Sequence, residues 1–418
     1  MRQPVHSQIR ILIPEGSSLS AREAIAALGP LGYSLALCDP NPLCVCRFSR
    51  FVSRFYPCPQ LGRDPQAYLA FILELLQREH FDVLLPVHEN AFLFSRAYAQ
   101  ISRFTHCAVS PFAAFERLQS KAAFTQLLDE LDLPHPPTHL VTRREEVEAC
   151  SSYPFYVKTA YGTAGFGAWR VENEAERLAV IRRLEKSAAF DRETPVLIQD
   201  VAPGVLEVVQ AVFDRGELAA AHGYRQTAVG VGGSAAARIK IERPLVIQHL
   251  RKLGQALAWH GSLMLDYLYD EPSGQVAYID PNPRLGETMN ATFNGINLAN
   301  CIVRLSLGEK ISSQPSRPAP VESHILITML LGKADQPGTR RAVLGELLAA
   351  LFKTGRYQHS QEDFANLGQD FPSLVPVLVV AVQLLLNPQS CHKIATRAVQ
   401  NYALTGTAVG QIQALPAN

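Results

Sequence analysis

Residues 263–284 have the sequence LMLDYLYDEPSGQVAYIDPNPR, in which two apolar runs flank a polar turn. The runs Leu263–Tyr269 and Gln275–Asp280 are mainly apolar and contain tyrosines, and the intervening DEPSG is typical of a tight turn. This pattern predicts an antiparallel hairpin.

Oxygen-bearing side chains occupy this predicted hairpin. Asp266 lies on its first strand, and Asp280 and Asn282 lie at the end of its second. Because positions two apart face the same way in an extended chain, Asp280 and Asn282 share a face. Carboxylate and amide oxygens suit Mg²⁺ beside nucleotide phosphates, and Arg284, two residues further on, can bind a phosphoryl oxygen. The hairpin is therefore a candidate metal site.

A second candidate is the segment YPFYVKTAYGTAGFGAWRV at residues 153–171. A predicted strand delivers Lys158 to a loop in which Gly162, Gly165 and Gly167 let the backbone approach a ligand closely. Phosphates need such backbone donors and a cation. The segment does not match G-x-x-x-x-G-K-[ST], and no helical pattern follows it, which disfavours P-loop and Rossmann sites. A glycine-rich hairpin in an ordinary sheet remains the alternative.

Together these motifs resemble the ATP-grasp superfamily. Residues 279–284, IDPNPR, followed by Gly286 and by NGINL at 294–298, are similar to its signature E-x-N-P-R with a downstream G-[VI]-[ND]-[LF]. The resemblance covers roughly residues 9 to 310. It implies that Lys158 and its loop clamp phosphate, and that Lys121, in QSKAAF, is the earlier lysine that contacts the nucleotide phosphates. A surface lysine is the alternative for Lys121.

The resemblance also implies an adenine site in VLIQDVAPGVLE, residues 196–207. It assigns Gln199, Asp200 and Val201 to the base and Glu207 to the ribose, with a salt bridge as the alternative for Glu207. Three positions depart from the family. Asp266 and Asp280 stand where glutamates are usual, which shortens their reach by one methylene, and Gln199 replaces a glutamate.

The N-terminal region shows apolar strands that alternate with helical runs. Strands are predicted at 9–14, 33–38 and 81–87, and helices at 20–28 and 65–79. This order predicts an open parallel sheet. Glu89 follows the last strand, and ligands gather at the carboxyl ends of such strands, so Glu89 is a candidate substrate residue, with helix capping as the alternative.

The predicted fold class is α/β, with α+β character in the nucleotide-binding part. An N-terminal open parallel-sheet domain at 1–107 precedes the ATP-grasp domains at 108–311, which include one helix over 115–131. A mostly helical extension at 312–418 follows the proline-rich SSQPSRPAP at 312–320.

Charge and composition exclude some functions. The chain has 39 Lys and Arg against 38 Asp and Glu, so its net charge of +1 gives no reason to expect nucleic acid. The chain has eight cysteines, and its first residues do not have the pattern of a secretory leader. A cytoplasmic location is therefore expected. Cys44 and Cys46 are expected to be small buried side chains, with a metal cluster as the alternative.

Residues 373–388, SLVPVLVVAVQLLLNP, are apolar but shorter than the ~20 residues that span a bilayer. A buried helix is expected there and no transmembrane helix. Peripheral contact of 373–388 with a membrane, or with a partner, is the alternative.

The resemblance implies an ATP-dependent carboxylate–amine ligase that uses Mg²⁺, with Mn²⁺ as an alternative ion. A carboxylate would attack the γ-phosphate, and an amine would open the acyl phosphate. Arg225 and Arg284 are the candidate catalytic residues, with structural pairing as the alternative for Arg225. The expected partners are a small carboxylic acid and an amine, such as an amino acid, and a homodimer is plausible. The alternatives are a biotin-carboxylase-like carboxylase, although no M-K-M attachment sequence occurs, and a non-catalytic nucleotide-binding regulator.

Overall fold

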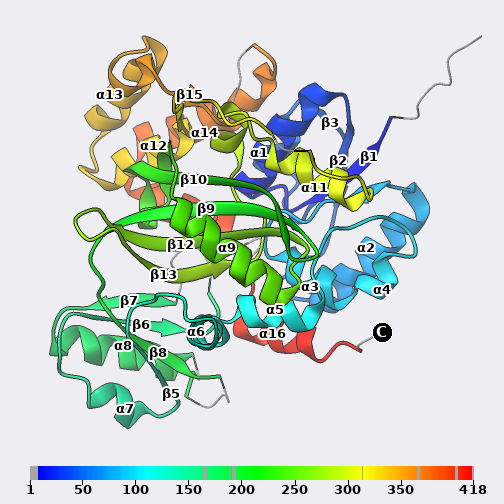
Figure 1. The fold of residues 1–418 in the computed structure, drawn as a ribbon. Coiled ribbons are helices and arrows are strands. Elements are labelled where there is room, and N and C mark those ends of the chain that lie inside the picture. The colour runs from blue at the N-terminus through cyan, green and yellow to red at the C-terminus, as the bar shows by residue number, and fades with distance from the viewer. Residues whose placement is uncertain are drawn as a thin grey trace, which may run out of the picture.

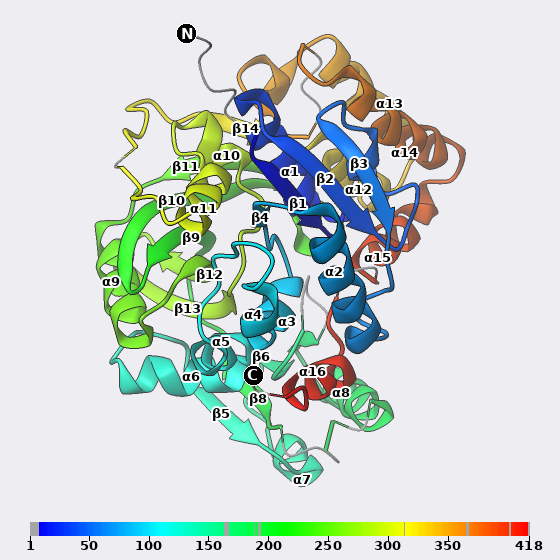
Figure 2. The same cartoon turned by 90° about the vertical axis from the view of Figure 1, so that its right-hand side faces the viewer.

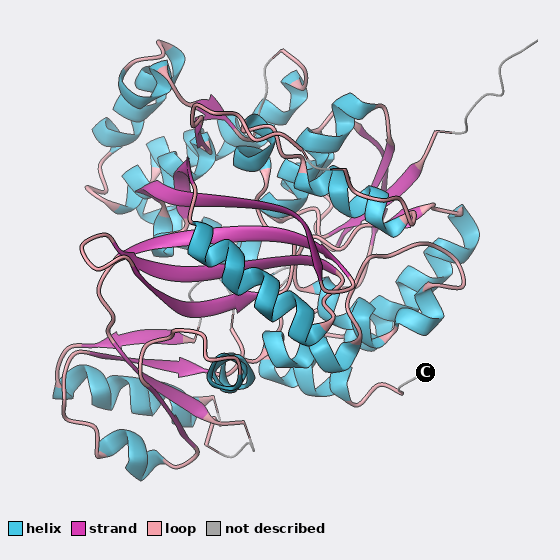
Figure 3. Ribbon diagram, viewed as in Figure 1, coloured by secondary structure: helices cyan, strands magenta, loops and turns pink. Residues whose placement is uncertain are grey.

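The computed structural model describes residues 8–416 except 163–166, 188, 191–193, 313, 365–367 and 401–402. Three sheets organise the described chain, one of seven strands and two of four, with helices around them (Figures 1 and 3). The expected α/β class, with parallel and antiparallel sheets, is confirmed.

The first sheet is parallel, with strand order β3-β2-β1-β4. Its strands and the helices of this region are β1 (Arg10–Pro14), α1 (Leu19–Leu28), β2 (Ser34–Asp39), β3 (Val52–Pro57), α2 (Pro65–Glu79), β4 (Val83–Leu84), α3 (Asn90–Arg96) and α4 (Tyr98–Ile101). The strand predicted at 81–87 is wrong in length, because only Val83 and Leu84 join the ladder. Leu85 and Val87 are still fully buried, which explains the unbroken apolar run.

The second sheet is small and antiparallel, with order β5-β8-β6-β7. Its elements are β5 (Thr138–Val141), α7 (Arg144–Glu148), β6 (Phe155–Thr159), β7 (Ala168–Val171), α8 (Glu174–Lys186) and β8 (Val196–Asp200).

Two helices precede the second sheet, α5 (Phe112–Gln119) and α6 (Lys121–Glu130). The single helix predicted over 115–131 is therefore wrong. Ser120 adopts an extended conformation, and its hydroxyl accepts a hydrogen bond from the Ala123 amide as the N-cap of α6. This break makes Lys121 the first residue of α6.

The third sheet has the order β13-β12-β9-β10-β11-β14-β15. Its elements are β9 (Val205–Asp214), β10 (Glu217–Val229), β11 (Ala235–Ile241), α9 (Pro244–Leu257), β12 (Gly261–Asp270), β13 (Gln275–Asn282), α10 (Met289–Phe293), α11 (Leu298–Ser306), β14 (Glu322–His324) and β15 (Gln361–Glu362). The hairpin expected from the opening motif is β12 and β13. Helix α9 lies across one face of this sheet (Figure 1).

The region after residue 320 is mostly helical. Its helices are α12 (Leu326–Asp335), α13 (Arg340–Leu351), α14 (Leu374–Leu386), α15 (Cys391–Gln400) and α16 (Gly406–Gln413). Strands β14 and β15 add to the large sheet, and α16 packs against α2 and α3. Among the described residues, no helix combines the length and the apolar character needed to cross a membrane. The boundaries at 107/108 and 311/312 stay predictions.

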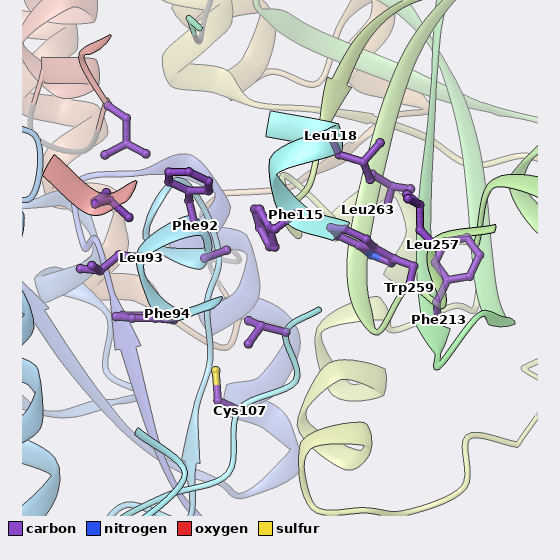
Figure 4. Close-up of a cluster of buried hydrophobic side chains, with 14 of the residues drawn as sticks. Phe92, Leu93, Phe94, Cys107, Phe115, Leu118, Phe213, Leu257, Trp259 and Leu263 are labelled. Carbon is purple, nitrogen blue, oxygen red and sulfur yellow. The ribbon is translucent and has the colours of Figure 1, made fainter. Parts of the chain in front are cut away.

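A continuous apolar core joins the parallel sheet to the large sheet (Figure 4). The Phe92 ring of α3 lies 6.0 Å from the Phe115 ring of α5, centre to centre, and Phe115 lies 5.3 Å from Trp259. This core fixes the carboxyl edge of the parallel sheet relative to the β12–β13 hairpin. Cys44 and Cys46 are buried, as expected.

Candidate active site

The β12–β13 hairpin brings three oxygen-bearing side chains together. Asp266 is the cross-strand partner of Asp280, and Met264 is the partner of Asn282. The Asn282 amide nitrogen lies 3.5 Å from the Asp266 Oδ1 atom. Because cross-strand partners share a face of a sheet, these side chains converge on one side of the hairpin.

A bulge beside this group frees a backbone carbonyl. Asp280 pairs with Asp266, but Tyr278 pairs with Tyr267, so Ile279 is the extra residue between them. The Ile279 carbonyl accepts a hydrogen bond from the Lys158 ammonium at 3.1 Å. The bulge at Ile279 therefore allows the hairpin to hydrogen-bond to Lys158 of the small sheet.

Two lysines approach the hairpin acids from the small sheet and its leading helix. Lys158, on β6, also donates to the Gln199 Oε1 atom at 2.7 Å. The ammonium of Lys121, the first residue of α6, lies 2.7 Å from the Asp280 Oδ1 atom and donates to the Gly162 carbonyl at 3.2 Å. Both lysines are largely buried. The structure thus brings Lys121, Lys158 and the hairpin acids into one group.

The charges in this group perturb one another. Burial, and then repulsion from Asp280, raise the pKa of Asp266 to about 7, against the opposing effect of Arg284 and Lys121. Burial lowers the pKa of Lys158 to about 8; Lys121 adds to this shift, and Asp280 and Asp266 oppose it. Such a site favours ligands that carry phosphate for the lysines and a divalent cation for the acids.

Of the three predicted loop glycines, Gly162 and Gly167 lie among the described residues. Gly167 has a φ of +85°, and a Cβ atom there would lie 2.2 Å from the Thr159 hydroxyl oxygen. Gly162 receives the Lys121 contact, and Gly165 lies outside the described residues. The donor set of Asp266, Asp280 and Asn282 fits Mg²⁺, which prefers oxygen ligands.

The predicted adenine residues end strand β8. The Gln199 amide is engaged at both ends, because Oε1 accepts from Lys158 and Nε2 donates to the Thr138 hydroxyl at 2.9 Å. Its side chain therefore orients the lysine in this structure. Asp200 and Val201 are exposed and leave the strand end open to a base.

The carboxyl edge of the parallel sheet meets the loop after β13. Arg284 forms an ion pair with Glu89 at 2.9 Å, and the other Glu89 oxygen accepts from Gln119 at 3.0 Å. The Gly286 amide donates to the Val87 carbonyl at 3.3 Å. The Glu89 side chain makes no capping bond to α3, so the helix-cap alternative is not what the structure shows.

The chain is similar in sequence to several known proteins. No family model matches the chain. It is 24% identical over 299 residues to D-aspartate ligase from Enterococcus faecium, covering 63% of this chain and 68% of that protein. It is also 24% identical over 212 residues to the arginine-specific large chain of carbamoyl phosphate synthase from Geobacillus stearothermophilus, covering 47% of this chain. The chain spans only 19% of the length of that relative.

Solved structures share the fold. L-amino acid ligase from Bacillus licheniformis matches with a TM-score of 0.61 at 16% identity, covering 76% of this chain and 80% of that one. The biotin carboxylase domain of 2-oxoglutarate carboxylase from Hydrogenobacter thermophilus, solved with MgADP, also gives 0.61, at 14% identity, covering 77% and 75%. The chain has the fold of these ATP-grasp proteins.

Two of the predicted site residues do not reach the lysine and aspartate group. Glu207 is the cross-strand partner of both Arg225 and Tyr267, whereas Asp266 is opposite Val208. Because successive residues of a strand face opposite sides, Glu207 and Arg225 lie on the other face of the sheet from Asp266. The expectation that Arg225 borders one site with Glu89 and Arg284 is therefore not met.

A separate ionic cluster holds these two residues on the α9 face. Glu207 is fully buried and bonds to both Arg225 and Arg243, and Glu271 bonds to the same two arginines. The cluster matches the salt-bridge and structural-pairing alternatives for Glu207 and Arg225. The spacing of these residues in the sequence could not predict this cluster, because a change of one residue in strand register moves every side chain to the opposite face of the sheet.

Two acidic residues near the candidate site were not picked out from the sequence. Glu287 follows the metal-site motif, accepts a hydrogen bond from the Ser20 hydroxyl at 3.1 Å and contributes to the raised pKa of Asp266. Glu15 follows β1, has a φ of +65°, and burial, then Glu89, raise its pKa. The signal that picked out Glu89, a polar residue after the carboxyl end of a parallel strand, also applies to Glu15.

Proposed function

We propose that this chain is an ATP-dependent, Mg²⁺-requiring ligase that joins a carboxylic acid to an amine. The observation that carries the proposal is the convergence of Lys121 and Lys158 on the oxygen donors Asp266, Asp280 and Asn282. Two cations beside a hard-oxygen set suit a nucleotide polyphosphate with its metal ion. D-aspartate ligase and L-amino acid ligase, by their names, join amino acids, which supports an acid and an amine as substrates.

The proposed chemistry has two transfers. A carboxylate oxygen of the acid bonds to the γ-phosphorus of ATP as the bond to the β-bridging oxygen breaks, giving an acyl phosphate and ADP. The amine nitrogen then bonds to the acyl carbon, phosphate leaves, and the amine loses a proton. No step needs a covalent bond to the enzyme, so the task of the chain is positioning and charge neutralisation.

Each residue has a defined place in this scheme. Lys121 and Lys158 exchange their present contacts with Asp280, Gln199 and the Ile279 carbonyl for phosphate oxygens. Asp266, Asp280 and Asn282 would hold the magnesium ion, which would supply charge neutralisation at the phosphates. Arg284, held by Glu89, faces the acid or the transferred phosphoryl group from the edge of the parallel sheet.

The test is ADP release by the whole chain with an array of small acids and amines. Turnover should require one acid and one amine together, and the product should contain both. Lys158→Ala and Asp280→Ala should lower turnover by at least about 100-fold, as expected when a phosphate-binding or metal-binding charge is lost. Lys252→Ala, an exposed lysine on α9, is the matched control and should retain wild-type turnover.

Other outcomes would replace the proposal. The likeness to a biotin carboxylase domain makes a carboxylase the second candidate, and ADP release that depends on bicarbonate without an amine would favour it. Nucleotide binding with no turnover for any acid would favour a regulatory protein.

A further inference from the structure

Helices α13 and α14 expose an unusual number of large apolar side chains. Among the described residues, nineteen large hydrophobic side chains are exposed, and ten of these fall between residues 344 and 386. We call these ten the apolar face: Leu344, Leu348, Leu351, Phe352, Phe371, Val375, Leu378, Val379, Val382 and Leu386. Scattered single residues of this kind need no explanation, but a contiguous group marks an interaction surface.

The apolar face is built on two packed helices. α13 and α14 contact each other and α12, and they lie side by side at the outer edge of the molecule (Figure 2). Val343, Val377 and Leu384 turn inward to the core, while the exposed residues recur three or four positions apart on the outer sides. The Arg340 guanidinium donates to the Leu386 carbonyl at 2.7 Å, so the start of α13 lies beside the end of α14.

The exposed Lys, Arg, Asp and Glu side chains of the segment that carries the apolar face have one sign. Among the described residues from 340 to 386, the exposed Lys and Arg are Arg340, Arg341 and Lys353. Every acid in this range is partly or fully buried and bonded to another part of the chain. These pairs are Glu346 with Tyr357, Glu362 with His324, Asp363 with Arg238, and Asp370 with Arg22. The undescribed residues 365–367 carry no charge.

We infer that the apolar face docks on an anionic phospholipid surface. An interfacial helix pair places apolar side chains about 5–10 Å into the boundary between headgroups and acyl chains, with basic residues at the phosphates. α14 carries no charged residue and, at 13 residues, lies along a bilayer rather than across it. A second copy of the chain fits less well. Among the described residues from 340 to 386 of the other copy, no exposed acid is present to pair with Arg340, Arg341 and Lys353.

The test is co-sedimentation of the whole protein with vesicles. Vesicles of phosphatidylcholine with 30% phosphatidylglycerol, a fraction of about the anionic content that attracts basic segments, should bind the protein. Pure phosphatidylcholine should bind it far more weakly, and 0.5 M NaCl, which shortens the screening length to less than about 10 Å, should weaken the anionic binding. The triple variant R340Q/R341Q/K353Q should bind anionic vesicles about 100-fold more weakly, at roughly fivefold for each charge lost.

A matched pair of double variants tests how much the apolar side chains contribute to vesicle binding. Leu378→Gln with Val382→Gln should reduce vesicle binding by at least about tenfold, because two apolar side chains lose their burial. Leu31→Gln with Leu43→Gln changes two equally exposed side chains elsewhere and should leave binding intact. Unfolding curves of both variants should match the wild type, since all four positions are exposed.

Three results would overturn the inference. The first is that the protein does not bind anionic vesicles. The second is that R340Q/R341Q/K353Q and Leu378→Gln with Val382→Gln both bind these vesicles as the wild type does. The third is a dimer in sedimentation equilibrium that Leu378→Gln with Val382→Gln dissociates, with no vesicle binding, which would assign the apolar face to a second copy. None of these results bears on acid- and amine-dependent ADP release.

Discussion

At the scale of single residues, Asp266 couples metal binding to pH. Its pKa is raised to about 7 because it is buried beside Asp280. Below that pH a divalent ion must displace the proton, so Mg²⁺ affinity should fall as pH falls from 8 to 6, by up to about tenfold for one proton released per pH unit. Isothermal titration of the chain with MgADP at the two pH values measures the effect.

The raised pKa of Asp266 also makes the stability of the fold depend on pH. A carboxyl whose folded pKa lies above its unfolded value stabilises the fold below about pH 4, and this contribution is lost as pH rises through about 7. The apo protein should therefore gain more thermal stability from MgADP at pH 8 than at pH 6. Asp266→Asn should abolish this difference. An equal gain for the wild type at both pH values would show that Asp266 is not titrating in this range.

Lys158 should limit nucleotide affinity at alkaline pH, independently of Asp266. Burial lowers its pKa to about 8, so the free chain loses this charge as pH rises above that value. Affinity for ADP without metal should therefore decline between pH 7.5 and 9.5, as measured by the same titration. Lys158→Arg keeps the charge throughout and should remove the decline. A decline that persists in this variant would place the titrating group elsewhere.

At the scale of elements, the loop after β13 depends on a glycine. Gly286 has a φ of +67°, and an added Cβ would lie 2.9 Å from the Met264 sulfur. Gly286→Ala should cost about 1–2 kcal/mol of stability, from left-handed strain and crowding, and should lower turnover because the loop carries Arg284. Chemical denaturation and ADP release measure the two effects.

The matched control is the same substitution in a helix. Gly345 lies within α13 and has open space at its Cβ position. Gly345→Ala should stabilise the chain by up to about 1 kcal/mol, because alanine has the higher helix propensity. Similar losses in both variants would mean that the left-handed conformation at Gly286 is not the cause.

These elements also show how far the sequence could predict the site. The hairpin and Lys158 follow from local patterns, since strand alternation and turn residues act over a few positions, whereas Lys121 was expected only from the family resemblance. The face that Glu207 occupies depends on its pairing with Tyr267 of β12, more than fifty residues away, and Arg225 shares that face as the partner of Glu207; no local pattern specifies this register. The break at Ser120 was missed because helical periodicity continues across a capping serine.

At the scale of the whole molecule, buried ion pairs join the C-terminal region to the rest of the chain. Arg238 of β11 bonds to Glu23 of α1 and to Asp363. The second Glu23 oxygen accepts from the Met289 amide at 2.7 Å, close to the loop that carries Arg284. These contacts could not be predicted from sequence, because they join segments more than a hundred residues apart. They make the helical extension part of the support of the candidate site.

Arg22 and Asp370 offer the sharpest test of this support. They pair at 2.9 Å, and both side chains are at most 2% exposed. Asp370 also accepts from the Ser49 hydroxyl at 2.6 Å and from the Arg50 amide at 2.8 Å. Asp370→Ala should cost about 3–5 kcal/mol in chemical denaturation, because it leaves a buried guanidinium without its counter-charge.

A double-mutant cycle separates that charge from the lost packing. Combining Arg22→Met with Asp370→Ala removes the unpaired charge, so the double variant should be more stable than Asp370→Ala alone by at least about 1 kcal/mol. The exposed pair Arg78 and Glu74 is the control, and Glu74→Ala should change stability by less than about 0.5 kcal/mol. Additive losses in the cycle would mean that the pair acts through packing alone. Coupling would show that the extension is held to α1 by the ion pair, and that its loss should reach the site through Glu23 and Met289.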